Sequence, residues 1–224
     1  MDDVVRRAPL FAGLDDEAAA ALRAAMVEIR LPRGKVLFRE GETGDQLFVI
    51  GAGKLKLGLV SADGRESLLS ILGPGEMFGE LSLFDPGART ATATAVTEAC
   101  VLGLSHRDLK PWLDRRPAVA ISLLQQISRR LRRANAVVGD MVFSDGPGRL
   151  AKTLLELSHR FGAPCPEGVR VTHGLTQGEL AQLVGASRET VNKALADFAV
   201  RGWLRKEARS IVLLDVERLR RRAG

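Results

Sequence analysis

Cysteine is scarce in this 224-residue sequence, which contains only Cys100 and Cys165. Disulfide scaffolds and thiolate metal sites need several cysteines at short spacings, and a single widely separated pair offers neither. We therefore interpret both cysteines as buried small hydrophobic residues and expect no metal site.

Long apolar runs and catalytic motifs are also missing. No run of 18 apolar residues occurs, and the chain opens with Met-Asp-Asp instead of the apolar stretch of a signal peptide. We expect a soluble, cytoplasmic protein with no membrane partner. The pattern G-x-x-x-x-G-K-[ST] is absent, and no Ser/His/Asp or Cys/His set is recognisable. An enzyme remains one alternative, but the sequence offers no catalytic residue for it.

Charge is distributed unevenly along the chain. Residues 1–116 carry 15 Lys and Arg against 17 Asp and Glu, a net charge of −2. Residues 117–140 have a net charge of +3, and residues 141–224, with 14 basic and 9 acidic residues, have +5. An acidic front and a basic back indicate a sensing part followed by a part that binds nucleic acid.

The segment Leu175–Trp203 has the pattern of a helix–turn–helix. Thr176 can cap a first helix, and Glu179 three residues later completes a capping box. Gly185 ends that helix, and Ser187 can cap a second one after a short turn. The second helix then has apolar residues at i, i+4, i+7 spacing, namely Val191, Leu195 and Phe198.

The second helix, over residues 187–201, carries polar residues on its outer face. Arg can bond O6 and N7 of guanine, and Glu can accept from N4 of cytosine. A recognition helix meets base edges through its N-terminal residues, so we expect this helix to read DNA. The alternative is a solvated face in which Glu189 pairs with Lys193. The residues expected to contact DNA are Thr176, Gln177, Ser187, Arg188, Glu189, Thr190, Asn192 and Lys193.

Residues 31–104 consist of brief apolar runs separated by glycine turns. Many short strands with turn residues at each break predict an antiparallel sandwich or barrel-like roll. The expected strands are KVLF, QLFVI, KLKLGLV, ESLLSIL, ATATAV and CVLGL. The residues before them are expected to form short helices, over Asp2–Arg7 and Asp15–Val27.

A helical period begins near Pro117. Apolar residues recur at alternating spacings of four and three, at Ala120, Leu124, Ile127, Leu131, Ala134, Val138 and Met141. A sustained 3.5-residue period favours a coiled-coil dimer, although a helix packed on its own domain would satisfy the same pattern. A dimer also accounts for one recognition helix per chain, because symmetric pairs read palindromic half-sites. We expect a hinge between Gly139 and Gly148.

The segments after the hinge complete a winged domain. After the recognition helix, two short strands, Trp203–Arg205 and Ser210–Leu214, form a hairpin that can place Arg205, Lys206 or Arg209 near phosphates. The other expected segments are a helix from the N-cap Asp145 to Phe161, an exposed loop over Gly162–Gly168, a strand over Val169–Thr172 and a last helix from Asp215.

The segment from Gly73 to Thr94 contains a candidate anion site. Gly79-Glu80-Leu81-Ser82 has the character of a one-turn helix start, whose free N–H groups favour anions. Arg89 follows among small apolar residues, and a phosphate suits its guanidinium fork. Glu80 is unfavourable beside an anion unless it accepts from a hydroxyl such as a ribose 2′-OH. The alternative is a structural ion pair between Arg89 and Glu80.

Three motifs together resemble the cAMP receptor protein/fumarate–nitrate regulator family of bacterial transcription factors. They are G-D-x-L-F-V-I-x-x-G, F-G-E-L-S-x6-R-T and V-G-A-S-R-E-T-V, in this order. The chain is most similar to the actinobacterial cAMP receptor branch. The resemblance implies an α+β fold in three parts: a jelly-roll-like cyclic-nucleotide β-roll (1–116), a long dimerisation helix with its hinge (117–144) and a winged helix–turn–helix (145–224).

The resemblance also implies site residues. Phosphate contacts of cAMP fall on Leu81, Ser82, Arg89 and Thr90, and the ribose contact falls on Glu80, with Gly79 allowing close backbone approach. Arg188, Glu189 and Lys193 take the base-reading positions. Other branches of the family use an N-terminal cysteine cluster or a haem-binding histidine of the roll. This chain has no cysteine before Cys100, and its three histidines lie outside the pocket segment, so no iron–sulfur cluster or haem is expected.

The sequence departs from the family pattern at two places. Where the cAMP binders carry two adjacent polar residues near the adenine, this chain has Ala134-Asn135, and alanine forms no side-chain hydrogen bond. One lost bond is worth roughly 0.5–1.5 kcal/mol, which weakens base discrimination more than it abolishes binding. Lys193 replaces an Arg of some relatives and loses the bidentate fork.

The sequence leaves three classes of function open. The first is a homodimeric regulator controlled by cAMP, or by another cyclic nucleotide, that reads a palindromic operator and acts on RNA polymerase. The second is a DNA-binding regulator that is independent of ligand or answers to another anion, with a degenerate pocket. The third is the enzyme.

Overall fold

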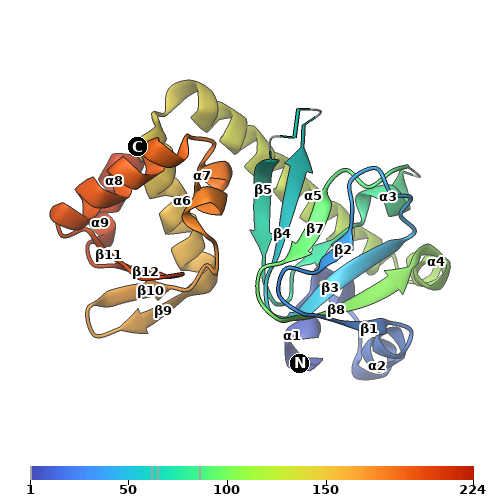
Figure 1. Ribbon diagram of the computed structural model, residues 1–224. Helices are drawn as coiled ribbons and strands as arrows, with labels where there is room; N and C mark the ends of the chain where they lie inside the picture. The colour runs from blue at the N-terminus through green and yellow to red at the C-terminus, as the bar shows by residue number, and fades with distance from the viewer. Residues whose placement is uncertain (1, 62, 65, 86) are drawn as a thin grey trace. The chain divides into compact units, whose positions relative to one another are not determined.

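The computed structural model describes residues 2–61, 63–64, 66–85 and 87–224 (Figure 1). The chain divides into two compact units. One contains residues 1–65 and 69–132, and the other contains residues 66–68 and 133–224. Among the described residues, no helix is long and apolar enough to cross a membrane.

The N-terminal part is a roll of two antiparallel sheets with short helices at its edges. One sheet has the strand order β1-β8-β3-β6, and the other has the order β2-β7-β4-β5. The strands are β1 (Val27–Leu31), β2 (Val36–Phe38), β3 (Gln46–Ala52), β4 (Leu55–Val60), β5 (Glu66–Leu72), β6 (Met77–Phe78), β7 (Thr92–Ala95) and β8 (Ala99–Ser105). The helices are α1 (Asp2–Val5), the 3-10 helix η1 (Pro9–Phe11), α2 (Asp16–Ala24), α3 (Leu81–Phe84) and α4 (His106–Arg115).

Two hydrophobic clusters stabilise the roll. The first lies between the sheets and includes Phe38, Phe48 and Phe78, whose rings are 5.4–5.9 Å apart between centroids. The second joins the N-terminal helices to β3 and β8 and to the start of the long helix through Val119 and Leu123. Burial of the apolar side chains in these two clusters stabilises the roll. The segment that precedes α3 is thereby held against the long helix, which it contacts through Met77 and Glu80.

The long helix α5 (Pro117–Phe143) is continuous through Gly139. Proline at its first position is compatible with a helix start, where no N–H partner is needed. The helix ends at Phe143, and Asp145 caps the next helix by accepting from the Gly148 N–H at 2.8 Å. The chain therefore breaks between Phe143 and Gly146, as expected, but Gly139 does not interrupt the helix.

The C-terminal part is a winged helix–turn–helix. Its helices are α6 (Gly146–Phe161), α7 (Gln177–Val184), α8 (Arg188–Val200) and α9 (Val216–Ala223). Its strands β9 (Gly162–Cys165), β10 (Gly168–Val171), β11 (Leu204–Lys206) and β12 (Ile211–Leu213) form one antiparallel sheet in the order β11-β12-β10-β9. In Figure 1 the hairpin β11–β12 directly follows α8, which is the arrangement of a wing.

The α+β fold expected from the sequence is confirmed, with four local corrections. The helix expected over Asp15–Val27 ends at Ala24, and Val27 begins strand β1; residues 162–165, expected to be a loop, form strand β9. The sequence did not predict α4 or β6. Finally, Cys100 and Cys165 are only partly buried, so the expectation that both are buried was wrong.

Candidate functional site

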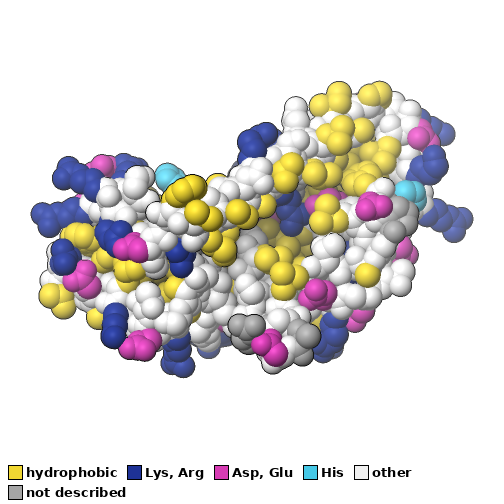
Figure 2. Space-filling model, turned by 90° about the horizontal axis from the view of Figure 1, so that it is seen from above, with side chains coloured by type: hydrophobic (Ala, Val, Ile, Leu, Met, Phe, Trp, Pro, Cys, Tyr) yellow, Lys and Arg dark blue, Asp and Glu magenta, His cyan; other side chains and the backbone are white. Residues whose placement is uncertain are grey.

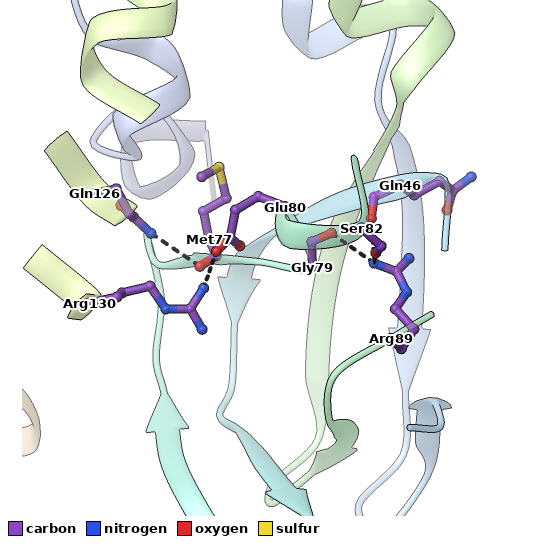
Figure 3. A network of polar contacts seen from close by, with 8 residues as sticks. All are labelled: Gln46, Met77, Gly79, Glu80, Ser82, Arg89, Gln126 and Arg130. Carbon is purple, nitrogen blue, oxygen red and sulfur yellow. Dashed lines mark hydrogen bonds and ion pairs between the residues drawn. The ribbon is translucent and has the colours of Figure 1, made fainter. Parts of the chain in front are cut away.

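Arg89 is the centre of a polar site in the roll, and only 6% of its surface is exposed. Its Nη1 donates to the carbonyl oxygens of Gln46, at 2.9 Å, and Gly79, at 2.8 Å, and lies 3.1 Å from Ser82 Oγ (Figure 3). The Nε atom is buried with no hydrogen-bond partner among the described residues. The guanidinium is therefore held by neutral acceptors and retains an unused donor.

Among the described residues, no carboxylate is bonded to Arg89 as a counter-ion. The guanidinium carbon lies 4.3 Å from the centre of the Phe38 ring and 5.5 Å from that of Phe48. Burial lowers the pKa of Arg89 from its ordinary value, which is opposed by the more distant charges of Asp45, Glu42 and Glu80. A buried cation of this kind favours binding of an anion.

Two glycines allow the backbone to approach Arg89. Gly79 has a φ of +81°, and a Cβ there would lie 2.8 Å from Arg89 Nη1. A Cβ on Gly44 would lie 2.3 Å from Arg89 Nε and 2.6 Å from Ser82 Oγ. Both positions therefore need glycine, for close approach at Gly44 and also for the left-handed backbone conformation at Gly79.

Glu80 lies beside this site and is fully buried. One carboxylate oxygen, Oε1, accepts a short ion-paired hydrogen bond from Arg130 of α5, whereas Oε2 is buried with no partner among the described residues. Next to it, Gln126 of α5 donates to the Met77 carbonyl at 3.2 Å (Figure 3). Arg89 and Glu80 are not bonded to each other, so the alternative of an Arg89–Glu80 ion pair is wrong.

A cavity opens between Arg89 and Arg130, the residue that is ion-paired with Glu80. All four phosphate contacts expected from the sequence line it, namely Leu81, Ser82, Arg89 and Thr90. The full set of lining residues is Phe38, Leu57, Gly79, Leu81, Ser82, Arg89, Thr90, Ala91 and Arg130. The walls thus combine apolar side chains with a few convergent polar groups, as ligand pockets do.

Ala134 and Asn135 are exposed on α5. They belong to the second unit, whereas the cavity lies in the first. Their contact with a ligand remains a prediction.

The helix–turn–helix forms as its capping residues predict. Thr176 accepts from the Glu179 N–H at 3.2 Å, and the Glu179 carboxylate accepts from the Thr176 N–H at 2.8 Å, which completes the capping box. Gly185 ends α7 with a left-handed φ of +67°, and Ser187 caps α8 by accepting from the Thr190 N–H. Local sequence therefore fixes both helix ends.

The outer face of α8 exposes most of the residues expected to read DNA. Arg188, Glu189 and Lys193 are exposed, and Glu189 and Lys193 form an ion pair at 2.7 Å. Asn192 is only half exposed, and its Oδ1 is buried with no hydrogen-bond partner among the residues that the structure describes. The exposed Glu–Lys pair contributes little to stability, so both groups remain available to another partner.

The wing is more constrained than the sequence suggests. Arg209 and Lys206 are exposed, but Arg205 is held by two carboxylates. Its Nη1 makes a short ion pair with Glu167, and its Nη2 lies 3.5 Å from Glu207. The expected DNA contact of Arg205 therefore competes with contacts inside the protein.

The apolar seam of α5 is largely uncovered within this chain. Leu124, Leu131, Val138 and Met141 are 55–63% exposed, and Figure 2 shows hydrophobic side chains gathered on the face it views. The seam residues Ala120 and Ile127 are partly buried. Exposed apolar residues at this spacing are typical of a helix that packs against another helix.

Sequence reasoning missed four residues that shape the pocket: Gly44, Gln46, Gln126 and Arg130. Gln46 contributes a backbone carbonyl, which no side-chain pattern reports. Arg130 is one of several arginines that flank the apolar seam of α5. Its neighbours in the sequence give no signal that it pairs with Glu80, which is 50 residues away. Gly44 lies within the G-D-x-L-F-V-I motif, which was the available signal.

The three histidines do not contribute to this pocket. His173 is buried, and its Nδ1 accepts from the Leu175 N–H at 3.0 Å, before the start of α7. Within the described part of the chain, no three His, Cys, Asp or Glu side chains are grouped as metal ligands.

Comparison with known proteins gives matches along the whole chain. Residues 28–116 match the model of the cyclic nucleotide-binding domain, and residues 148–222 match the Crp-like helix-turn-helix domain. A CRP-like cAMP-activated global transcriptional regulator of Mycobacterium tuberculosis is 52% identical over 223 residues, covering 100% of both chains. The cyclic AMP receptor protein of Thermus thermophilus is 34% identical over 94% of this chain and 97% of its own length.

Solved structures agree on the fold. The structure of FixK2 from Bradyrhizobium japonicum superposes with a TM-score of 0.81 over 89% of this chain and 98% of that chain, at 22% identity. At this identity the likeness concerns the fold alone. The two sequence relatives are named as a transcriptional regulator and a receptor protein, and the enzyme alternative is set aside.

Proposed function

The chain belongs to the CRP/FNR family of transcription regulators, and we propose that it is a homodimeric DNA-binding regulator controlled by cAMP. The printed names of the two relatives support cAMP as the effector. The pocket in the roll also supports cAMP as the effector, because its polar groups are suited to bind a phosphate and a ribose hydroxyl.

The proposal rests on two buried polar atoms, Arg89 Nε and Glu80 Oε2, that have no hydrogen-bond partner in the described part of the chain. Buried polar groups are nearly always hydrogen-bonded, and an unsatisfied one costs about 1–3 kcal/mol. One atom is a charged donor and the other a charged acceptor. Arg89 lines the pocket, and Glu80 is ion-paired with another lining residue, Arg130. A cyclic nucleotide supplies the complements, because its phosphate accepts hydrogen bonds and its ribose 2′-OH donates one.

In this arrangement each pocket residue has a distinct role. Arg89, with Ser82, Thr90 and the backbone at Leu81, binds the cyclic phosphate. Glu80 accepts from the ribose hydroxyl, and Gly79 allows the backbone to approach. Arg130 orients the Glu80 carboxylate through its ion pair. Asn135, beside Ala134, is the remaining candidate for the adenine.

The DNA-binding role belongs to the winged helix–turn–helix. Arg188, Glu189 and Lys193 read base edges, with Thr190 and Asn192 nearby in the same helix. Thr176, Gln177 and Ser187 lie at helix starts, where hydroxyl, amide and N–H groups contact phosphates. Arg209, and in part Arg205, contact the backbone from the wing. Two copies joined along the α5 seam present two recognition helices to a palindromic operator.

We propose the division 1–116, 117–144 and 145–224 for the roll, the dimerisation helix and the DNA-binding domain. The two family matches, which end at residue 116 and begin at residue 148, support this division. A regulator of this kind acts in the cytoplasm and acts on RNA polymerase at the operator. No residue of the pocket requires a metal, haem or iron–sulfur group.

Calorimetric titration of the full-length protein with cAMP and with cGMP tests the proposal. We expect cAMP to bind, with a modest preference over cGMP because Ala134 forms no bond to the base. Binding of neither nucleotide, by a protein that binds operator DNA, would instead support the ligand-independent regulator.

A further inference from the structure

The wing contains an acidic residue at the centre of a small ionic network. Glu207 Oε1 lies 3.2 Å from Arg170 Nη2 and 3.5 Å from Arg205 Nη2, and its Oε2 accepts from Ser210 Oγ at 2.6 Å. Glu167, near the tip of the hairpin β9–β10, makes a second, short ion pair with Arg205. Two carboxylates thus bind two guanidinium groups of neighbouring hairpins.

Sheet register explains why the two arginines are close. Arg205 of β11 and Arg170 of β10 both pair with Val212 of the central strand β12. Paired residues of antiparallel strands point to the same face, so the two cations lie in one row across three strands. Such a row of cations is suited to a phosphate backbone, and the two carboxylates neutralise it.

Glu207 is ionised at neutral pH. Its pKa is lowered from the ordinary value, chiefly by the hydrogen bond from Ser210 and further by Arg170 and Arg205. About half of the Arg170 and Arg205 side chains is exposed, at 48% and 46%, so solvent and other ions reach both cations. Exposed ion pairs of this kind are weak, and a phosphate can compete for them.

We propose that Glu207 and Glu167 limit the affinity of this protein for DNA by competing with phosphates for Arg205 and Arg170. The inference rests on the proposed DNA-binding function of the winged domain. In this role the acids touch no base and affect all sequences alike. They leave Arg209 and Lys206 as the unopposed cations of the wing, since neither has an ion pair among the described residues.

The test is binding of full-length Glu207→Gln and Glu167→Gln to an operator duplex and to a scrambled duplex of equal length, across a salt series. We expect each variant to bind both duplexes more tightly, by roughly three- to tenfold at about 0.1 M salt. The log–log salt slope should become steeper by about one unit, as for one additional phosphate contact. Glu217→Gln, which removes an acid paired with Arg220 on α9, is the matched control and should change neither quantity.

A double variant separates release of Arg205 from a general change of charge. Arg205→Ala added to Glu167→Gln, which removes a carboxylate paired with Arg205, should cancel most of the gain in affinity and restore the salt slope. Glu167, 51% exposed near a hairpin tip, provides a second variant if Glu207→Gln perturbs the wing.

The outcomes distinguish this inference from the function on which it rests. Unchanged affinity and salt slope in both glutamine variants, with the wild type binding DNA, would overturn the inference alone. A gain of Glu167→Gln that persists after Arg205→Ala would also overturn it, because the cation that Glu167 releases would not be responsible. A wild type that binds neither duplex would overturn the proposed DNA-binding function, and the inference with it.

Discussion

Arg89 and Glu80 show how a buried charge can be kept in a protein while part of its bonding capacity is left for a ligand. Arg89 is stabilised by two carbonyls and a hydroxyl, and Glu80 by Arg130, yet each retains one buried atom without a partner. Breaking a buried pair is costly because it leaves an uncompensated charge. On the proposed function, the permanent contacts hold each charged group, and the remaining atom of each is the one that binds the nucleotide.

Replacement of Arg89 by alanine should remove most of the affinity for cAMP. The expected loss is roughly 1.5–3 kcal/mol, as for a charge-assisted hydrogen bond. Calorimetric titration measures this loss, and Arg107→Ala, at an exposed position of α4, is the control. An unchanged affinity in Arg89→Ala, with circular dichroism showing an intact fold, would refute the phosphate assignment.

Arg188 and Arg209 should differ in what they contribute to DNA binding. Arg188→Ala removes a base contact and should cost about 1–3 kcal/mol at one guanine while relaxing specificity there. Arg209→Ala removes a phosphate contact, so it should weaken all sequences alike and lower the salt slope by about one unit. Binding to a set of mutated operators compares the two variants, each serving as the control for the other. The reverse pattern would show that the docking orientation is wrong.

At the scale of elements, helix ends depend on caps whose energetic effect can be measured. Asp145 caps α6, and Arg222 of α9 donates to both of its carboxylate oxygens, at 2.8 and 2.6 Å. Arg222, followed by the Gly148 N–H, lowers the pKa of Asp145 below its ordinary value of 3.8. A depressed carboxyl pKa means that the stabilisation is present above the unfolded-state pKa and is lost as pH falls through the folded-state value.

Asp145→Ala should therefore destabilise the C-terminal unit by about 1 kcal/mol at neutral pH, as for the loss of an N-cap. The difference from wild type should shrink as pH falls below the ordinary carboxyl pKa of 3.8 and through the lower folded-state value of Asp145. Unfolding followed by Trp203 fluorescence in a Trp112→Phe background reports on this unit. Asp197→Ala, an exposed acid paired with Arg201 within α8, is the control and should have a smaller effect. A difference independent of pH would contradict the assignment.

The α5 seam makes a second prediction at this scale. Leu131→Glu places a charge in the proposed helix–helix interface and should convert the dimer to monomers. Ala136→Glu makes a comparable change on the opposite face of the same helix and should leave the dimer intact. Sedimentation velocity measures both, and a Leu131→Glu variant that remains dimeric would argue that the seam is not the interface.

The elements that the sequence predicted well are those whose signals are local. The ends of the two helices in the helix–turn–helix were predictable from the N-caps Thr176 and Ser187 and the left-handed Gly185. Each of these residues acts within one turn of the chain. The strand β1 was missed since an alanine-rich helix precedes it, and its partner β8 lies about 70 residues away. Helix α4 was hidden by Pro111 inside it. Strand β9 contains Pro164, which an edge strand tolerates and a central strand does not.

The same distinction applies to the candidate site. The motif around Glu80 and Arg89 identified the two ionic groups, but their partners were not predictable. Arg130 is distant in sequence, and the Gln46 carbonyl belongs to the backbone. The wing carboxylates that hold Arg205 were missed for a similar reason, because Glu167 belongs to another hairpin.

At the scale of the whole molecule, the open question is how strongly the nucleotide affects DNA binding. A ligand shifts an equilibrium between two arrangements only by its difference in affinity for them. The family resemblance places Ala134 and Asn135 at the adenine, on the helix that also forms the proposed dimer. Alanine provides no hydrogen bond there, so one source of differential affinity is missing.

We therefore expect a modest coupling between cAMP and operator in the wild type, about 1–2 kcal/mol, at the low end of the usual allosteric range. Ala134→Thr restores a hydroxyl and should raise both the affinity for cAMP and the effect of cAMP on operator binding. The measurement is operator affinity with and without saturating cAMP in both proteins, and Ala134→Val, which adds similar bulk without a hydroxyl, is the control. A wild type that already responds a thousandfold, or a threonine variant no more responsive than the valine variant, would mean that the missing hydroxyl does not limit the coupling.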